Sequence, residues 1–230
     1  MVRGEILKNG TKVFTSETHR VNADGPLLAA FIEPKGGERL LDMCSGSGIV
    51  PLWLYDRGFR GETAAVEIQP DAAALFKKAV RANQIDSISI LEMDHRDFSG
   101  ARKFDIVSCN APYFTDKNGA LSREPGRATA RSAVENSVFD MAVSAARNLK
   151  EGGRLCCCWP PGRAESLFAA LRQAQLSLKR LRLCRHSESK LPWLMLVEAR
   201  LRGGEGLRVL DDFIAEYGGE KTGEYREIFT

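Results

Sequence analysis

The chain has 230 residues, of which 43% are hydrophobic and 27% charged, and its formal net charge is +3. Such a chain can bury a substantial core without disulfides or metal, and its apolar content excludes disorder, collagen and coiled coil. No apolar run approaches the roughly 18 residues of a membrane span, and the N-terminus shows no secretory signal. We therefore expect a cytoplasmic protein of one domain, without membrane contact.

The N-terminal residues predict a short extension in front of the main fold. Asn9-Gly10 separates two apolar runs within Glu5–Phe14, a pattern typical of a β-hairpin. Asp24 and Pro26 then favour a helix that continues to about Ile32. We expect residues 1–36 to form this extension.

A strand–helix rhythm follows, and it indicates an open, mostly parallel α/β sheet with helices on both faces. The predicted strands are Arg39–Met43, Thr63–Ile68, Ile88–Met93, Phe104–Cys109 and Arg154–Trp159. The predicted helices are Ile49–Asp56, Asp71–Asn83, Val134–Leu149 and Ala164–Gln173.

The rhythm changes after Leu176. Leu178–Arg185 alternates apolar and basic residues, and Trp193–Leu201 forms another predicted strand, with only the polar loop His186–Pro192 between them. These two strands should pair antiparallel at an edge of the sheet, which gives seven strands and a core over residues 37–202. The tail, residues 203–230, is rich in glycine and charge, and we expect it to dock loosely.

The cysteines and histidines give no sign of a metal or redox site. The six cysteines contain no C-x-x-C pair, and the three histidines lack the i, i+4 spacing of a metal-binding helix. Cys156, Cys157 and Cys158 are adjacent, so in a strand their side chains point alternately to opposite faces. We predict reduced, buried cysteines that act as small hydrophobic side chains, and no bound metal.

A glycine turn follows the first core strand, with the sequence Asp42-Met43-Cys44-Ser45-Gly46-Ser47-Gly48. Pro51 occupies the third glycine position of a dinucleotide motif, and the turn is unlike a P-loop. Acidic residues instead follow three successive strands, at Asp42, Glu67 and Asp94. They suit a ligand with a ribose, an adenine and a positive charge, which describes S-adenosylmethionine and not a polyphosphate. The predicted donor-binding residues are Asp42, Ser45, Gly46, Gly48, Glu67, Ile68, Asp94 and Asn110.

The segment Asn110-Ala111-Pro112-Tyr113 follows the fourth core strand and therefore faces the same crevice as the glycine turn. An amine conjugated to a ring or carbonyl is a poor nucleophile, because its lone pair is delocalised. The Asn110 side-chain oxygen and the Ala111 carbonyl can accept its two N–H groups and align the nitrogen with a methyl group. No strong general base is required. The candidate catalytic residues are Asn110, Ala111, Pro112 and Tyr113.

The segment Phe114–Arg131 has no apolar periodicity and predicts a mobile loop over the substrate. Its cations, with two aromatic residues that can stack on a planar base, are the candidate substrate-binding residues: Tyr113, Phe114, Lys117, Arg123, Arg127 and Arg131. The predicted edge strand carries a second basic group: Lys179, Arg180, Arg182 and Arg185. This second group could bind phosphates, or it could prevent an edge strand from pairing with another chain, and both explanations fit equally well.

In these motifs the chain resembles the bacterial tRNA1(Val) (adenine-37-N6)-methyltransferase family, over nearly its whole length. The matching segments are His19–Asp24, the glycine turn, Glu67–Gln69, Phe104–Val107, the Asn-Pro-Tyr-Phe region from Asn110, Ala130-Arg131, Leu196–Glu198, Gly203-Gly204 and Gly223–Tyr225. The resemblance implies a Rossmann-like class I methyltransferase fold, S-adenosylmethionine as cofactor, tRNA as partner and N6-methylation of an adenine.

The chain departs from this family's pattern at two positions, and two alternative functions remain. Cys44 stands at a usual glycine, and Ala111 replaces the first proline of N-P-P-Y, which affects rate and substrate choice more than reaction type. One alternative is a protein glutamine-N5 methyltransferase, although those enzymes typically have a larger N-terminal domain than the about 38 residues before the first core strand allow. The other is a non-catalytic module that binds the donor or RNA. The sequence gives no indication of oligomeric state.

Overall fold

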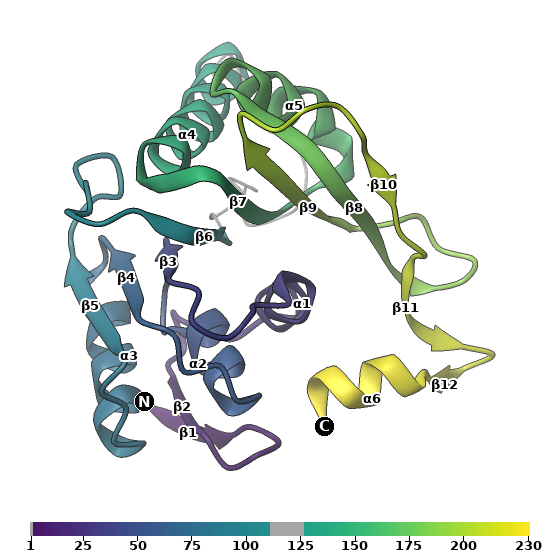
Figure 1. Ribbon diagram of the computed structural model, residues 1–230. Helices are drawn as coiled ribbons and strands as arrows, with labels where there is room; N and C mark the ends of the chain where they lie inside the picture. The colour runs from purple at the N-terminus through teal and green to yellow at the C-terminus, as the bar shows by residue number, and fades with distance from the viewer. Residues whose placement is uncertain (1, 111–126) are drawn as a thin grey trace.

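A computed structural model describes residues 2–110 and 127–230 of the chain, with residues 127–136 described by their backbone only (Figure 1). The strands are β1 Arg3–Ile6, β2 Lys12–Thr15, β3 Leu40–Met43, β4 Thr63–Glu67, β5 Ile88–Glu92, β6 Phe104–Cys109, β7 Leu149–Trp159, β8 Leu176–Ser187, β9 Leu194–Leu201, β10 Arg208–Val209, β11 Phe213–Tyr217 and β12 Glu220–Lys221. The helices are α1 Asp24–Ile32, α2 Ile49–Asp56, α3 Pro70–Ala82, α4 Arg127–Asn148, α5 Ala164–Gln173 and α6 Gly223–Phe229, with a 3-10 turn at Pro161–Arg163.

The main sheet has the strand order β12-β11-β8-β9-β7-β6-β3-β4-β5, with β10 also paired to β8. Strands β5, β4, β3, β6 and β7 are parallel, and β9 lies antiparallel between β7 and β8. β1 and β2 form a separate antiparallel hairpin. The predicted fold class, a mostly parallel α/β sheet with antiparallel C-terminal strands and an N-terminal hairpin, is therefore confirmed.

Helices cover both faces of this sheet. Successive side chains of a strand point to opposite faces, so each face contributes to its own hydrophobic core. Cys157 packs in the core under α4 and α5, whereas Cys156 and Cys158 pack in the core under α1 and α2. These three side chains are fully buried, and the described cysteines are all reduced. The prediction of reduced, buried cysteines is confirmed for these three, and Cys156 and Cys157 act as small hydrophobic side chains.

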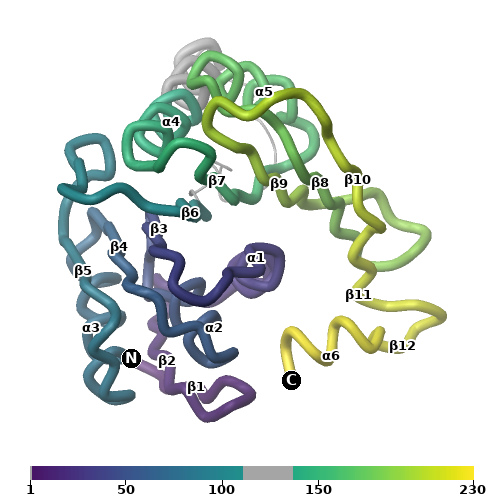
Figure 2. The backbone as a smooth tube through the Cα atoms, viewed as in Figure 1, coloured from purple at the N-terminus to yellow at the C-terminus, as the bar shows by residue number. Residues whose placement is uncertain are grey.

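The C-terminal tail packs more closely than the sequence indicates. β11 pairs parallel with β8, and Phe213 on β11 is only 1% exposed. The Thr222 hydroxyl caps α6, which folds back on α1 and α2, where the Trp53 indole N–H donates to the Ile228 carbonyl at 3.2 Å (Figure 2). The expected loose docking is therefore wrong, and the tail adds three short strands to the seven predicted.

β8 is consequently not an edge strand, and its basic side chains have partners within the protein. Arg182 pairs with Glu224 at 2.5 Å, and Arg185 pairs with Asp212 at 2.5 Å. Lys179 donates to the Gly204 carbonyl. The structure therefore does not support a phosphate-binding surface along β8, because these cations are already used to attach the tail.

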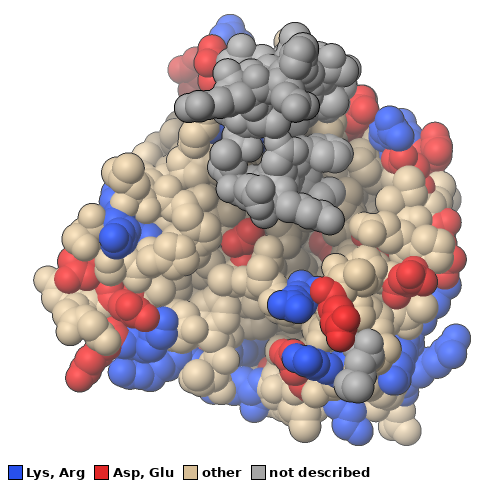
Figure 3. All heavy atoms as spheres, turned by 180° about the vertical axis from the view of Figure 1, so that it is seen from behind, with Lys and Arg blue, Asp and Glu red and all other residues tan. Residues whose placement is uncertain are grey.

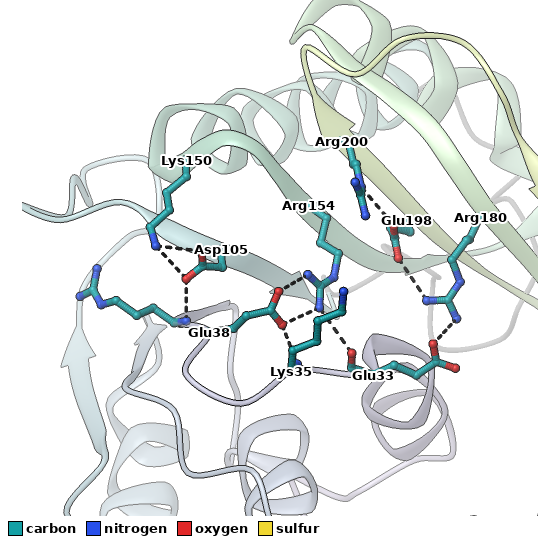
Figure 4. A network of polar contacts seen from close by, with 10 residues as sticks. Glu33, Lys35, Glu38, Asp105, Lys150, Arg154, Arg180, Glu198 and Arg200 are labelled. Carbon is teal, nitrogen blue, oxygen red and sulfur yellow. Dashed lines mark hydrogen bonds and ion pairs between the residues drawn. The ribbon is translucent and has the colours of Figure 1, made fainter.

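The amino ends of the core strands carry a further polar network (Figure 4). Arg154 forms a two-pronged ion pair with Glu38, at 2.6 and 2.9 Å. Arg180 bridges Glu198 of β9 at 3.1 Å and Glu33, after α1, at 3.2 Å. This network attaches α1 to the sheet at the end away from the carboxyl ends of the strands.

The starts of α4 and β7 differ from the prediction. α4 begins at Arg127, so Arg127 and Arg131 belong to a helix and not to a loop. β7 begins at Leu149, and a register shift against β6 between Phe104 and Ile106 accommodates the glycines that predicted a helix end. Among the described residues, no helix is both long and apolar enough to cross a membrane.

Candidate active site

A cleft of about 570 Å³ lies at the carboxyl ends of β3, β4, β5 and β6. It is bounded by the glycine turn, the start of α2, part of α4 and the segment between β2 and α1. Figure 3, seen from behind, shows the surface hollowed beside the grey residues, with charged side chains of both signs around the hollow. Seven of the eight predicted donor-binding residues line this cleft: Asp42, Ser45, Gly46, Glu67, Ile68, Asp94 and Asn110.

Glu67 joins the end of β4 to the glycine turn. Its carboxylate accepts the backbone N–H of Gly46 at 2.7 Å and that of Gln69 at 2.8 Å, and the residue is only 3% exposed. Each carboxylate oxygen retains a further lone pair, so the group can also accept ligand hydroxyls from the cleft. Gly46 has φ +56°, and a Cβ built there meets nothing within 4 Å, so this side of the turn is open to a ligand.

Asp42, the last acid before the turn, has one carboxylate oxygen without a partner. Its Oδ1 accepts the Ser108 hydroxyl at 2.5 Å, whereas the buried Oδ2 has no hydrogen bond in the described structure. Burial, with a smaller contribution from the nearby charge of Glu67, raises the pKa of Asp42 to about 7. A cation in the cleft would offset the cost of this buried carboxylate.

Asp94, after β5, is held in the ionised form at the mouth of the cleft. Arg96 donates to it from the guanidinium at 2.6 Å and from the backbone at 2.8 Å. The hydrogen bonds from Arg96 lower the pKa of Asp94 to about 2. The Asp94 carboxylate can therefore accept a hydrogen bond at any physiological pH, which a contact with the amino group of adenine requires.

Asn110 ends β6 and lines the same cleft as Gly46. Its Oδ1 accepts the thiol S–H of the buried Cys158, at an Sγ–Oδ1 distance of 3.1 Å. Cys158 lies on the neighbouring strand β7, so two strands fix the direction of the amide. No local sequence pattern connects these two residues, because their pairing depends on the β6–β7 register.

Gly48 and Cys44 both have the left-handed backbone conformation in this turn. Gly48 is outside the cleft lining and has φ +86°, and a Cβ there would lie 2.2 Å from the Phe76 ring. Its place against Phe76 explains the glycine without a ligand contact. Cys44 has φ +56°, the left-handed conformation that glycine adopts most easily, which explains the glycine usual in the resembling family.

The cleft contains residues that the sequence analysis did not assign to it. His95 hydrogen-bonds Ser144 at 3.1 Å, and burial lowers its pKa. The segment from Thr18 to Asn22, which precedes α1, forms one wall. Most of this wall belongs to His19–Asp24, a segment in which the sequence resembles the methyltransferase family. No local sequence pattern indicates that it borders the cleft.

Several predicted residues cannot be placed. Ala111, Pro112, Tyr113, Phe114, Lys117 and Arg123 lie outside the described residues. Arg127 and Arg131 lie in α4, where only the backbone is described. Within the described ranges, no three His, Cys, Asp or Glu side chains gather so as to hold a metal ion, and the predicted absence of a metal stays a prediction.

The described cleft fits the methyl donor expected from the sequence. Its volume lies within the range of small-molecule sites, roughly 300–1,000 Å³. The unpartnered Oδ2 of Asp42 suits a cationic ligand, and the open side of Gly46 allows close approach to the backbone. Ile68, 61% exposed at the cleft, offers apolar surface to an adenine ring.

Solved structures share this fold. The chain matches a predicted O-methyltransferase from Agrobacterium tumefaciens with a TM-score of 0.72 and 19% identity, over 89% of this chain and 94% of that one. It matches TrmN from Thermus thermophilus with a TM-score of 0.58 and 18% identity, over 77% and 48% of the two chains. At these identities the likeness concerns the fold alone.

Curated relatives share more sequence. A tRNA1(Val) (adenine(37)-N6)-methyltransferase from Glaesserella parasuis is 30% identical over 142 residues, 61% of this chain and 59% of the relative. The enzyme of the same name from Aliivibrio fischeri is 25% identical over 183 residues, 79% of this chain and 77% of the relative. The match thus spans about three fifths of the first relative's length and more of the second's. The model of the methyltransferase small domain family matches residues 6–163. The chain therefore belongs to the methyltransferase small domain family, in which S-adenosylmethionine supplies the methyl group.

Proposed function

We propose that this protein transfers a methyl group to the exocyclic N6 of an adenine in tRNA. The position of Asn110 supports this most directly, because it brings an amide oxygen into the donor cleft beside the glycine turn. The names of the relatives favour adenosine 37 of tRNA1(Val) as the target.

The residues of the cleft have separable roles in this reaction. When bound, the donor supplies a methyl group on a cationic sulfur, so that the N6–C bond forms as the C–S bond breaks. Asn110 Oδ1 accepts one N–H of the adenine amine and directs the nitrogen lone pair toward the methyl carbon. As the nitrogen gains positive charge, this hydrogen bond strengthens, and the second proton passes to solvent.

The charges of the cleft favour a cationic donor over an anionic ligand. Asp42, Glu67 and Asp94 approach it from three neighbouring strands. Loss of the sulfonium charge on transfer weakens the attraction of these carboxylates for the product, which assists its release.

The experiment is transfer of labelled methyl from S-adenosylmethionine to bulk unmodified tRNA, followed by nucleoside analysis. We expect label in N6-methyladenosine. Label in protein glutamine would favour the protein methyltransferase, and donor binding without transfer to RNA or protein would favour the non-catalytic module. Either result would overturn the proposal.

A further inference from the structure

The loop between β8 and β9 lies at the same end of the sheet as Asn110. β8 runs parallel to β7 and β6, because both β7 and β8 are antiparallel to β9. The end of β8 and the start of β9 therefore flank the cleft, on the side away from the donor-binding strands β4 and β5. A substrate held at Asn110 must lie toward this side.

The end of β8 and the residue before β9 carry a flat aromatic pair. The rings of His186 and Trp193 stack at a centroid distance of 4.0 Å and an interplanar angle of 10°. Trp193 is half-buried and packs edge-on against Phe213 at 6.5 Å, whereas His186 is exposed. One face of the imidazole thus rests on Trp193, and the other is available to a ligand.

The stack is fixed to the wall of the cleft. The Trp193 indole N–H donates to Asp24 Oδ1 at 3.4 Å, and the Asn22 amide donates to Asp24 Oδ2 at 3.3 Å. Asn22 itself lines the cleft. The surface from the cleft wall to the aromatic pair is therefore held by direct contacts, and Trp193 has little freedom to turn.

The distance from Asn110 suits a neighbouring nucleotide and not the methylated base. The register places Asn110 level with Leu196 of β9 and Arg182 of β8. With the usual strand spacings, Trp193 then lies about 14 Å and His186 about 20 Å from Asn110. A base that is methylated must leave its stack, so its neighbours in the strand become available for stacking on the protein.

Resting on the proposed function, we propose that the outer face of His186, supported by Trp193, stacks a second base of the RNA substrate, a few nucleotides from the methylated adenine. Every nucleotide offers a flat ring, whereas few residues of a peptide do, so the parallel geometry favours RNA over a protein substrate. Lys190 is exposed on the same loop and can contact the adjoining phosphate.

The test compares binding of an unmodified tRNA1(Val) transcript by wild type, His186→Ala and His186→Phe. Because His186 is exposed and His186→Ala removes only its stack on Trp193, we expect all three proteins to melt within about 3 °C of one another and to bind the donor equally. Stacking on an aromatic side chain predicts that His186→Ala weakens RNA binding about tenfold, while His186→Phe stays within about twofold of wild type. The control is Val209→Ala, an exposed apolar side chain on β10, which should not change RNA binding.

A second measurement locates the stacked base. Stem-loop RNAs with 2-aminopurine at each loop position in turn should show one position, other than the target, whose fluorescence is quenched by wild type and released by His186→Ala. Wild-type affinity in His186→Ala, or equal weakness in His186→Phe, would overturn the stacking inference while leaving methyl transfer to tRNA intact. Wild-type protein that methylates a protein and does not bind tRNA would overturn both proposals.

Discussion

The carboxylate of Glu67 accepts the backbone N–H of Gly46 at 2.7 Å, which links the end of β4 to the turn after β3. The hydrogen bond holds the glycine turn in the shape that leaves the cleft open. Glu67 is only 3% exposed and has no basic partner among the described residues, because backbone N–H groups satisfy its carboxylate.

Replacement of Glu67 by Gln should weaken donor binding. The amide removes the charge and leaves one of the two backbone N–H groups without its acceptor, so the turn loosens. A charge-assisted hydrogen bond contributes about 1.5–3 kcal/mol, which predicts a rise in the donor Kd of about tenfold or more in calorimetry. The matched control is Glu92→Gln, since Glu92 pairs in register with Glu67 on β5 but forms an exposed ion pair with Lys77. Equal affinity in Glu67→Gln and wild type would contradict this role.

Cys158 should affect the rate of methyl transfer and not donor affinity. Its thiol donates to Asn110 Oδ1, so Cys158→Ala frees the amide to rotate and should lower kcat about threefold to tenfold. Cys158→Ser keeps a donor and should retain most of the rate. Cys156→Ala is the control, because Cys156 is equally buried on the same face of β7 and the volume lost is the same. If Cys156→Ala slowed transfer as much as Cys158→Ala, the effect would be one of packing.

The buried carboxylate of Asp42 should make donor binding depend on pH. Its folded pKa of about 7 is above the unfolded value, so the folded protein holds an extra proton between about pH 4 and 7, and this group's contribution to stability falls as pH rises through that window. A cationic donor favours the ionised form, so binding should release a proton and tighten as pH rises to about 7.

Calorimetry in buffers of different ionisation enthalpy would count that proton. Asp42→Asn should bind the donor more weakly at pH 8 and lose the proton release. Any pH dependence that remains in the variant belongs to other groups of the cleft, such as His95. Asp94 contributes none, because its pKa of about 2 keeps it ionised throughout. Unchanged proton release in Asp42→Asn would exclude Asp42 as its source.

Charge reversal on β8 should reduce stability and not RNA affinity. Arg182→Glu breaks the ion pair with Glu224 and places two acids together, at a cost of about 1 kcal/mol, or a fall in Tm of roughly 3 °C. The double exchange Arg182→Glu with Glu224→Arg should recover most of the loss. Arg208→Glu, at an exposed position on β10 for which the described residues provide no ion pair, should leave Tm unchanged. Weaker RNA binding without a change in Tm would contradict the structural role.

Local sequence patterns predicted the bounds of several elements correctly. α2, β6 and α5 begin and end at the predicted residues, because glycine, proline or charge marks their boundaries. β11 was missed because apolar and polar residues do not alternate along its sequence and because it pairs with β8, a distant segment. Its strand character depends on a neighbour that no local pattern reveals.

The sequence predicted those residues of the candidate site that lie at the ends of the core strands. Asp42, Glu67, Asp94 and Asn110 were found because the carboxyl ends of parallel strands meet at one edge. The S–H donor to Asn110, the cleft wall before α1 and the partners of the β8 arginines depend on contacts between distant segments.

The measurement that tests the account most directly is methyl transfer to tRNA by wild type and Asn110→Ala under the same conditions, with donor affinity measured in parallel. We predict that wild type places label in N6-methyladenosine. Asn110→Ala should bind the donor within about threefold of wild type and transfer methyl at least about a hundredfold more slowly, as for loss of a group that acts on the reacting atoms. Equal transfer rates in the two proteins would contradict the role of Asn110, and label outside adenine would contradict the proposed reaction.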